Sequence, residues 1–236
     1  MAIEASIIIP TYNERDNIGI LINEIMKVKD DNNLVLEVIV VDDNSYDGTV
    51  EVVEGLMRKY DCIKLLRRPR KMGLGSAYKD GFKLSTKPII VTMDADLSHD
   101  PKVLPSMVEP IHNSQADIVL GSRYIEGGAI EGWPLKRRII SKGANFLARL
   151  ILGLEVKDTT TGYRAYRREV FKQITKMSRR NYFDFQIEVL YLAKKYNWRV
   201  AEVPITFRDR SRGKSKFNIR EVLKFAWTLT SLRLGL

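Results

Sequence analysis

The sequence predicts an α/β fold in which a mostly parallel sheet carries helices on both faces. Apolar runs of strand length alternate with segments of helical periodicity, and this alternation occurs four times before residue 100. Several of these runs are continuous rather than alternating, which is typical of parallel strands buried on both faces. Polar and acidic residues follow them directly, as expected at the sheet edge where open α/β folds bind ligands.

The first half of the chain supplies the regular strand and helix pairs. Pro10 closes the first apolar run, because proline cannot donate to a sheet ladder. Asp47-Gly48 marks a turn before the second helix. The crossovers between parallel strands should be right-handed. The expected strands are residues 5–9, 37–41, 62–66 and 89–93, and the expected helices begin at Asp16 or Asn17, run over residues 50–60, and pass through Tyr78 and Phe82.

The alternation ends in the second half. Residues 136–152 are expected to form a helix with a cationic first turn, which the helix dipole disfavours and which a bound anion would explain. The last helix, from residue 218, should place Ile219, Leu223, Ala226, Trp227 and Thr230 on one face, and this face either packs on the sheet or lies on a membrane. The other expected elements are a helix opening at Pro101, a strand at 116–120, loops at 127–134 and 157–164, a helix at 184–196, a strand at 200–207 and a charged loop at 208–216.

Composition limits the function classes. The 236 residues carry a net charge of +10, so we expect an anionic partner: nucleic acid, acidic membrane lipid or a phosphorylated small molecule. Cys62 is the only cysteine, which excludes an internal disulfide or a cysteine-cluster metal site. We see no secretory signal and no apolar stretch of about 18 residues, so we expect no membrane span.

Two carboxylates end the central strand. Asp94 and Asp96 follow the run at residues 89–93 and would share a face of the extended chain, where their charges repel unless a cation lies between them. Hard oxygen ligands suit Mg²⁺ or Mn²⁺. The alternative is a turn in which both aspartates cap backbone amides.

Other strand ends carry similar groups. Asn13-Glu14 and Asp42-Asp43 should meet the first pair at one edge of a parallel sheet. Such a cluster suits either a metal that holds a diphosphate, or hydrogen bonds to sugar hydroxyls and a base on which Tyr12 could stack. Gly73-Leu-Gly75 and Gly213-Lys-Ser215 do not complete a nucleotide-binding loop motif. We expect His99 to be a turn residue and His112 to lie on a helix surface, rather than either being a ligand.

An ordered series of motifs gives the chain a family resemblance. The series resembles glycosyltransferase family 2, and within it the dolichol-phosphate (polyprenol-phosphate) mannose synthases. The resemblance extends from Ile7 to about Lys216 and rests on Pro10-Thr-Tyr12-Asn-Glu14, Asp42-Asp43-Asn-Ser, Gly73-Leu-Gly75, Asp94-Ala-Asp96-Leu-Ser-His, Gly-Ser-Arg123-Tyr and Gly-Trp133-Pro-Leu-Lys-Arg137-Arg-Ile-Ile-Ser141.

The resemblance implies a GT-A fold over residues 1–217, followed by an amphipathic helix at 218–236. It also implies metal-dependent transfer of mannose from GDP-mannose to dolichyl (polyprenyl) phosphate, with inversion. The alternative within the enzyme class is polyprenyl-phosphate glucose synthesis from UDP-glucose. Because a lipid phosphate is already ionised, this transfer needs cationic screening rather than a general base.

The site residues implied by the resemblance fall into three groups. The donor would contact Pro10, Tyr12, Glu14, Val40, Asp42, Asp94, Ala95 and Asp96, with Arg210 and Lys216 closing over its phosphates. The acceptor phosphate would lie against Arg123, Arg137 and Ser141. Asp96 would be the principal metal ligand, and Ser98, where relatives can carry a Gln, is the second candidate; Asp94, Asp96 and Arg123 would be catalytic.

The implied partners follow from the acceptor. A polyprenyl phosphate requires a membrane surface, on the cytoplasmic face by resemblance, and a small membrane-anchoring subunit is a further expected partner. A basic nucleic-acid-binding protein is the competing class. We expect no nucleic-acid partner, because the aromatic residues are not interleaved with the basic clusters as a stacking platform requires.

Overall fold

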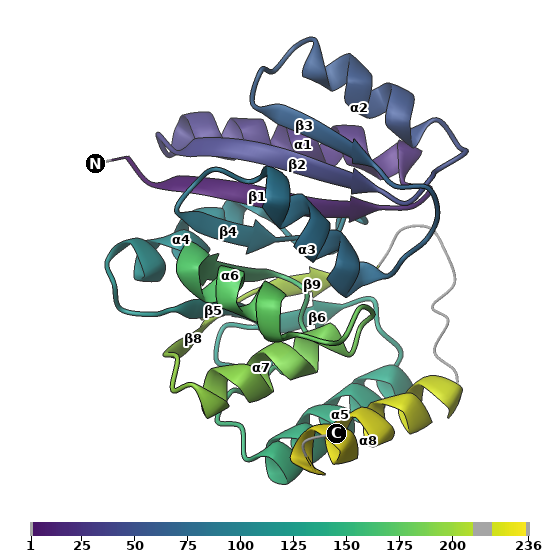
Figure 1. Cartoon of the computed structure of the whole chain (residues 1–236), viewed down its shortest axis with the longest axis vertical. Coiled ribbons are helices and arrows are strands. Elements are labelled where there is room, and N and C mark those ends of the chain that lie inside the picture. Colours follow the sequence, from purple (N-terminus) through teal and green to yellow (C-terminus); the bar gives the residue numbers. More distant parts are fainter. Residues whose placement is uncertain (1, 210–218, 235–236) are drawn as a thin grey trace.

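The computed structural model describes residues 2–209 and 219–234 and shows a sheet covered on both faces (Figure 1). Its strands are β1 (Glu4–Thr11), β2 (Val35–Asp42), β3 (Ile63–Arg67), β4 (Ile89–Thr92), β5 (Ile118–Ser122), β6 (Ala129–Glu131), β7 (Arg164–Arg167), β8 (Val200–Pro204) and β9 (Thr206–Arg208). The main sheet has the order β3-β2-β1-β4-β7-β5-β8, in which only β7 is antiparallel to its neighbours. The predicted mostly parallel sheet is confirmed.

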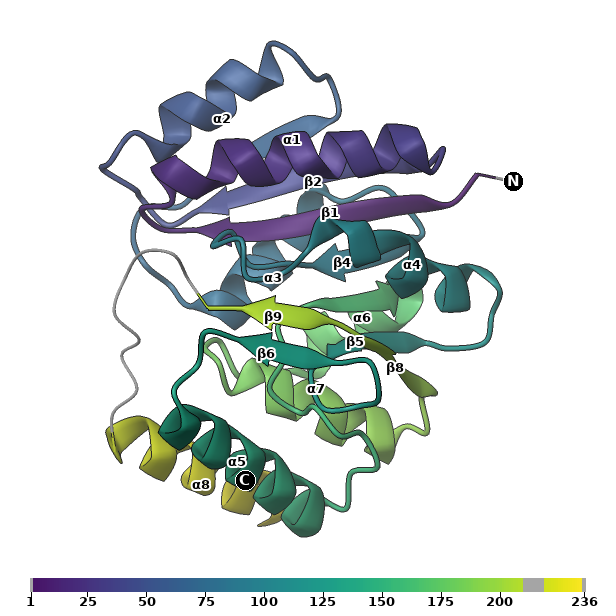
Figure 2. The same ribbon diagram turned by 180° about the vertical axis from the view of Figure 1, so that it is seen from behind.

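Helices lie on both faces of this sheet. They are α1 (Arg15–Asp31), α2 (Thr49–Met57), α3 (Leu74–Leu84), α4 (Leu104–His112, after a 3-10 turn at Pro101–Val103), α5 (Leu135–Leu152), α6 (Arg168–Met177), α7 (Phe185–Lys195) and α8 (Ile219–Leu234). The face with α1, α2 and α4 is seen in Figure 2, and the face with α3, α6 and α7 in Figure 1.

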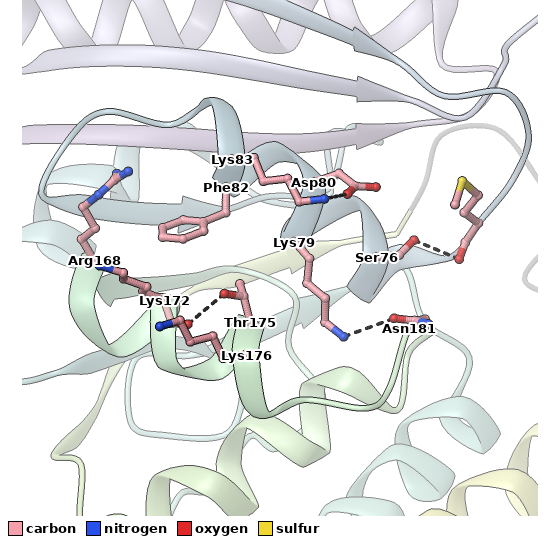
Figure 3. A pocket seen from close by; sticks show the side chains of 11 residues that line it. Ser76, Lys79, Asp80, Phe82, Lys83, Arg168, Lys172, Thr175, Lys176 and Asn181 are labelled. Carbon is pink, nitrogen blue, oxygen red and sulfur yellow. Dashed lines mark hydrogen bonds and ion pairs between the residues drawn. The ribbon is translucent and has the colours of Figure 1, made fainter.

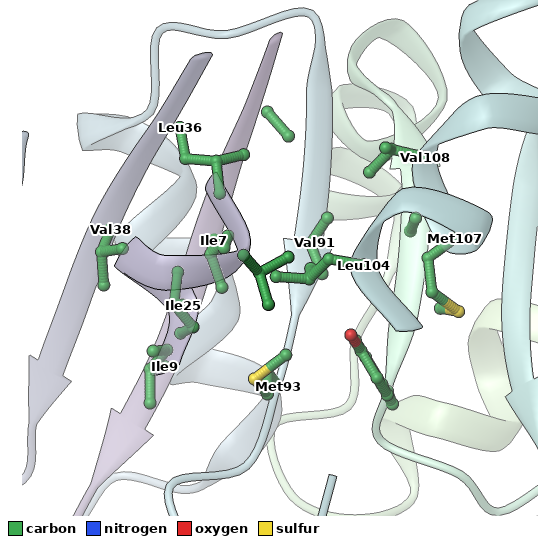
Figure 4. Close-up of a cluster of buried hydrophobic side chains, with 14 of the residues drawn as sticks. Ile7, Ile9, Ile25, Leu36, Val38, Val91, Met93, Leu104, Met107 and Val108 are labelled. Carbon is green, nitrogen blue, oxygen red and sulfur yellow. The ribbon is translucent and has the colours of Figure 1, made fainter. Parts of the chain in front are cut away.

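The hydrophobic core is divided by the sheet. Along β1, Ile7 and Ile9 belong to the cluster under α1 and α4, whereas Ile8 belongs to the cluster under α3 and α7. All three side chains are fully buried, as continuous apolar strands of a parallel sheet require. Figure 4 shows the first cluster, in which Val91 of β4 lies beside Leu104 of α4; Met93, directly after β4, belongs to the same cluster. The core under α1 and α4 therefore holds the carboxyl end of β4 in place.

The sequence analysis missed one strand and the helix after it, β7 and α6, which together form an insertion between β5 and α7 in the chain. β7 and α6 follow the polar segment at residues 157–163, and β7 enters the sheet between β4 and β5. The strand is only four residues long and has an arginine at each end, so it lacks the apolar run that indicates a strand. Its antiparallel course places the loop before it at the same sheet edge as the end of β4.

Two further expectations were wrong in detail. The expected loop at 127–134 contains β6, which pairs in parallel with β9, and the expected strand at 200–207 is divided into β8 and β9. β8 pairs with β5 as far as Pro204, and the chain then joins the separate two-stranded sheet. The small sheet lies beside the carboxyl ends of β5 and β4, because the Ile205 amide donates to the Ser122 carbonyl and the Arg208 amide donates to the Ser98 carbonyl.

The last helix packs through a different face from the one expected. In the described part of α8, the buried side chains include Leu229 and Leu232, whereas Trp227 is 64% exposed. α8 lies against α5 and α7 rather than on the sheet, and Figures 1 and 2 both show α5 and α8 side by side at one end of the molecule. Of the expected face, the side chains that the structure describes, Ala226, Trp227 and Thr230, are therefore exposed.

Candidate functional site

The ends of β1 and β2 form the first wall of the site. Thr11 pairs with Asp42 in the strand register, and the Thr11 hydroxyl donates to the Asp42 carboxylate over 3.0 Å. The backbone amide and hydroxyl of Ser45 also donate to Asp42. Because Asp42 is fully buried, its carboxylate shapes the loop after β2 and is not presented at the surface. A direct donor contact of Asp42 therefore stays a prediction.

An aromatic and cationic cluster lies on this wall. The rings of Tyr12 and Tyr46 meet edge to face with centroids 6.4 Å apart, and the Lys71 ammonium lies 4.5 Å from the Tyr12 ring centroid. Tyr12 is partly exposed, at 38%, so one part of its surface is accessible to a ligand. The three residues come from the loops after β1, β2 and β3. The structure thus gives Tyr12 the surroundings that a stacking residue needs.

The remaining donor-side residues lie close by on the same strands. Pro10 and Val40 lie within β1 and β2, and Val40 is buried. Glu14 precedes α1, where its backbone amide donates to the Thr49 hydroxyl and its carboxylate accepts from the Asn17 side chain. All three positions are therefore at or near the carboxyl edge, as predicted.

A buried ion pair between Asp43 and Arg68 was not anticipated. The Arg68 guanidinium donates to the Asp43 carboxylate, to the Ser76 hydroxyl and to the Gly73 carbonyl, while the Met72 amide also donates to Asp43. Arg68 is only 5% exposed. The pair attaches the basic loop after β3 to the end of β2. Asp43 and the basic loop were both visible in the sequence, but nothing in it indicated that they pair.

Asp94 and Asp96 lie at the end of β4, as expected. The Asp96 carboxylate accepts the backbone amide and hydroxyl of Ser98, at 3.1 and 2.5 Å, around Leu97 with a positive φ of 62°. This is the turn-capping arrangement that the sequence analysis held as the alternative, and it uses one oxygen of Asp96. Asp94 is more open, with 28% of its side chain exposed, and Ala95 between the two is buried.

His99 lies in the bend after β4, as expected of a turn residue, and it packs against this site. It is buried, and its Nδ1 accepts the backbone amide of Asp94 over 3.2 Å. The other ring nitrogen lies 4.0 Å from an Asp94 carboxylate oxygen, and the ring stacks on Tyr163 with centroids 5.1 Å apart. Gly162 lies on the other side, where an added Cβ would come 3.2 Å from Asp94. His99 and Gly162 therefore limit where the Asp94 carboxylate can point.

The donor set at the end of β4 suits a hard divalent cation. Asp94 and Asp96 offer carboxylate oxygens, which are the ligands that Mg²⁺ and Mn²⁺ prefer. Among residues 2–209 and 219–234 no three His, Cys, Asp or Glu side chains come together as a complete metal site. Ser98 lies beside the pair, but its hydroxyl is engaged in holding Asp96. A cation here would take its remaining ligands from water and substrate phosphates, as Mg²⁺ usually does.

Arg123 forms a buried ion pair with Asp158. The Arg123 Nε and one terminal nitrogen each donate to the Asp158 carboxylate over 2.7 Å, and the Arg123 backbone amide adds a third bond at 3.0 Å. Burial alone would raise the pKa of Asp158, but the hydrogen bonds and charge of Arg123 lower it. Burial opposes the charge on Arg123 as well, yet Asp158, with Asp94 as a smaller contributor, raises its pKa. The Arg123 guanidinium is thus held in one position, and its positive charge is largely balanced by the Asp158 carboxylate.

Arg137 and Ser141 lie on α5 next to this pair. Arg137 forms an ion pair of 2.8 Å with Asp209 and lies 4.0 Å from the Trp133 ring centroid. The Ser141 hydroxyl accepts from the Tyr124 hydroxyl over 2.7 Å. Tyr124 follows Arg123 directly, so Arg123, Arg137 and Ser141 do share one region, as predicted.

Aromatic rings connect the two halves of the site. His99 meets Phe207 edge to face at 5.7 Å, and Phe207 meets Trp133 at 5.3 Å. Arg123 lies 5.4 Å from the ring centroids of both Phe207 and Trp133. A continuous set of contacts therefore runs from the Asp94 loop to the arginines of the second half. Trp133 follows β6 and Phe207 lies within β9, and the sequence analysis did not place these two segments together.

Two predicted donor residues, Arg210 and Lys216, lie outside the described residues. A further arginine, Arg164, supports the site from beneath. It is fully buried and donates to the carbonyls of Thr159, Thr161 and Gln186. These bonds shape the loop that carries Asp158 and Gly162.

Comparisons with known proteins agree with this layout. The chain is 40% identical, over 94% of its length, to a dolichol-phosphate mannosyltransferase of Pyrococcus furiosus, of which the match covers 61%. It is 38% identical, over 92% of its length, to a polyprenol monophosphomannose synthase of Mycolicibacterium smegmatis, of which 83% is covered. The chain thus spans about three fifths of the length of the first relative.

Solved structures resemble the chain in fold. One is glucosyl-3-phosphoglycerate synthase from Mycobacterium tuberculosis in complex with Mn²⁺, UDP and phosphoglyceric acid, with a TM-score of 0.71 and 20% identity over 99% of this chain and 78% of that one. Another structure of that enzyme, with Mg²⁺ and UDP, has a TM-score of 0.70 and 17% identity over 99% of this chain and 79% of that one. At these identities the likeness shows the GT-A fold alone.

The family assignment rests on the sequence match together with the geometry at the sheet edge. The family model described as Glycosyl transferase family 2 matches residues 6–175, which include β1 to β7 and both aspartates after β4. The chain therefore belongs to glycosyltransferase family 2.

Proposed function

We propose that the chain transfers mannose from GDP-mannose to dolichyl or another polyprenyl phosphate, with inversion at the sugar. The names of the two relatives at about 40% identity support this activity. The observation that carries the proposal is the single cluster in which the carboxylates after β4 meet the arginines near α5 through the aromatic rings. A donor diphosphate and an acceptor phosphate are both anions, and this cluster offers each one a separate region of charge-complementary groups.

The donor region consists of the loops after β1, β2 and β4. Tyr12 would stack on the base, and Asp94 with Asp96 would hold Mg²⁺ or Mn²⁺. When bound, the cation supplies positive charge to the departing diphosphate. His99 accepts the backbone amide of Asp94, and Gly162 leaves room beside the carboxylate, so both residues would help to position Asp94 toward the sugar nucleotide.

The acceptor region needs no general base. A lipid monophosphate carries between one and two negative charges near neutral pH, so its oxygen is already a nucleophile. Arg123 and Arg137 instead lower the electrostatic cost of bringing that oxygen toward the donor. Because Arg123 is held by Asp158 and by aromatic rings, it keeps its position while the acceptor approaches. Attack by the phosphate oxygen on the face opposite the diphosphate gives the inverted product.

A membrane surface is the proposed location of the reaction. No helix in the described part of the chain is both long and apolar enough to cross a bilayer. α5, however, exposes a row of large apolar side chains: Leu135, Ile139, Phe146 and Leu150, between 61% and 73% exposed. Their spacing places them on one face of the helix, which is the pattern of a helix lying in a membrane interface. Trp227 and Leu234 of the neighbouring α8 are exposed as well. The cytoplasmic face and an anchoring subunit stay predictions.

Two assays test this function. Purified protein is incubated with a short-chain polyprenyl phosphate, Mg²⁺ or Mn²⁺, and either GDP-mannose or UDP-glucose, and the lipid product is measured. We expect product from GDP-mannose only; product from UDP-glucose alone would replace the proposal by the glucose alternative. In the second assay, Asp96→Ala should abolish transfer while the thermal unfolding midpoint changes by a few degrees at most, and retained activity would contradict the metal role of Asp96.

A further inference from the structure

A cationic pocket adjoins α5 on the side next to its apolar row. The pocket has a volume of about 610 Å³, and the residues that determine its charge and shape are Arg123, Tyr124, Arg138, Lys142, Arg149 and Lys157. None of the residues that line it is an aspartate or glutamate. Arg138, Lys142 and Arg149 are spaced as i, i+4 and i+11, so they form one row along the helix. Each residue of this row lies three positions after a residue of the apolar row, namely Leu135, Ile139 and Phe146. The two rows therefore lie side by side on α5.

The cations that line the pocket, apart from Arg123, form no ion pair with the described residues. Arg138 donates to the Ile130 carbonyl, and no ion pair or side-chain hydrogen bond joins Lys142, Arg149 or the Lys157 ammonium to a side chain of residues 2–209 or 225–234. By contrast, the acceptor cations implied by the family resemblance are both compensated, Arg123 by Asp158 and Arg137 by Asp209. Lys142, Arg149 and Lys157 therefore bring uncompensated positive charge to the pocket.

Another groove, in the described part of the chain, shows that a cluster of cations alone does not leave positive charge available for a ligand. It lies between α3 and α6, and Figure 3 shows its lining side chains. There the Lys79 ammonium donates to the carbonyls of Ser178 and Arg180, and Lys83 pairs with Asp80 over 2.7 Å. Lys172 lies 3.8 Å from Glu169. Most of the charged side chains in that groove therefore already have hydrogen-bond or ion-pair partners within the protein.

The pocket also lies next to the proposed acceptor position. Arg123 lines the pocket and belongs to the site, and Tyr124 lines the pocket while its hydroxyl donates to Ser141. An anion in the pocket would be separated from the site by the Tyr124 side chain. On the other side, the apolar row of α5 would face the hydrocarbon chains of a membrane in which the anion is anchored.

We propose that Arg138, Lys142, Arg149 and Lys157 form a receiving site for the phosphate monoester headgroup of a membrane lipid, which then passes Tyr124 to reach Arg123 and Arg137. This proposal deepens the proposed function, because it names where the acceptor is first bound. A phosphate monoester carries more charge than the phosphodiester of a common phospholipid, so uncompensated cations favour it.

The test uses the double variant Lys142→Gln/Arg149→Gln, whose side chains are exposed and make no described contact. Co-flotation measures binding to neutral vesicles that contain a few per cent of polyprenyl phosphate, to vesicles of equal charge that contain phosphatidylglycerol, and to neutral vesicles alone. We expect the variant to bind the polyprenyl phosphate vesicles about tenfold or more weakly, with a smaller change on phosphatidylglycerol. In the transfer assay, KM for the acceptor should rise by a similar factor while KM for GDP-mannose stays within twofold.

Two controls define the interpretation. Lys172→Gln/Lys176→Gln on α6 removes the same charge from the other groove, and Lys142→Arg/Arg149→Lys keeps the charge in the pocket; both should bind as the unmodified protein does. The proposal would be overturned if the Lys142→Gln/Arg149→Gln variant lost binding equally to both anionic vesicles, or if the α6 variant lost as much binding. It would also be overturned if the pocket variant lost only the binding of inorganic phosphate, tested without vesicles. If the protein shows no transfer at all, the proposed function fails while the vesicle measurement still tests the pocket.

Discussion

The ion pair between Arg123 and Asp158 offers the sharpest test of how the site is held together. In Asp158→Asn the carboxylate loses its charge, and an amide nitrogen replaces one of the oxygens that accept from Arg123. Both side chains are at most 6% exposed, so the Arg123 charge would be left buried without its partner. Breaking a buried pair in this way costs about 3–5 kcal/mol of unfolding free energy. At about 2–4 °C per kcal/mol for a chain of this size, the unfolding midpoint should fall by roughly 6–20 °C.

The measurement is urea-induced unfolding followed by circular dichroism, with thermal unfolding as a second readout. Asp209→Asn is the matched control, because it removes the carboxylate partner of Arg137 by the same chemical change. Since Arg137 and Asp209 are 25% and 30% exposed, that variant should lose no more than about 1 kcal/mol. Equal destabilisation by the two substitutions would refute the argument that burial determines the strength of the Arg123 pair.

The same pair predicts how stability and activity separate. Replacing both partners, as in Arg123→Met/Asp158→Leu, removes the uncompensated charge and should recover much of the stability lost in Asp158→Asn. Transfer activity should stay low in this double variant, because the cation beside the acceptor is missing. Recovery of activity along with stability would mean that Arg123 has a purely structural role.

Other predictions concern stability at low pH and the geometry of Asp94. Burial by itself would raise the pKa of Glu37, but its hydrogen bonds, the largest from Lys64, lower it from 4.5 to about 2. The ionised Glu37 therefore stabilises the folded state above pH 4.5, and this contribution is lost as the pH falls toward 2; in Glu37→Gln, urea unfolding between these pH values should show a shallower pH dependence. Gly162→Ala should lower kcat about tenfold with little loss of stability, because the added Cβ would lie 3.2 Å from the Asp94 carboxylate and displace it. Gly143→Ala is its control, since nothing lies within 4 Å of that position, and equal kcat losses in both variants would contradict the argument.

The sequence was most informative where local pattern and fold coincide. Continuous apolar runs gave the four parallel strands from β1 to β4, and the acidic residues after β4 indicated the site, because both signals lie in adjacent residues. β7 was missed because Arg164 and Arg167 flank only two apolar residues. Arg164 is fully buried through bonds to three carbonyls, a role that no local pattern announces.

The sequence also could not indicate which charged residues form ion pairs with one another. Asp158 lies in a polar segment with several hydroxyl residues, where an aspartate usually serves a turn. It becomes the partner of Arg123 only because β7 runs antiparallel between β4 and β5 and returns that segment to the carboxyl edge. The same insertion brings Gly162 against Asp94. The missed strand and the missed site residues thus have one cause.

Under the proposed function, the distribution of charge around the insertion would let two anionic substrates share one site. Charges that must keep a fixed position, on Arg123 and Arg137, are paired with carboxylates and stacked on Trp133. Pairing lowers their long-range attraction for anions but holds them within hydrogen-bonding reach of a phosphate that has already arrived. Long-range attraction must then come from elsewhere, and Lys142 and Arg149 of α5, which form no ion pair with the described residues, line the adjoining pocket beside the apolar row. The pocket cations on α5 would therefore attract the acceptor, whereas Arg123 and Arg137 would position it. Substitutions of the pocket cations should raise KM for the acceptor, and substitutions of Arg123 or Arg137 should lower kcat.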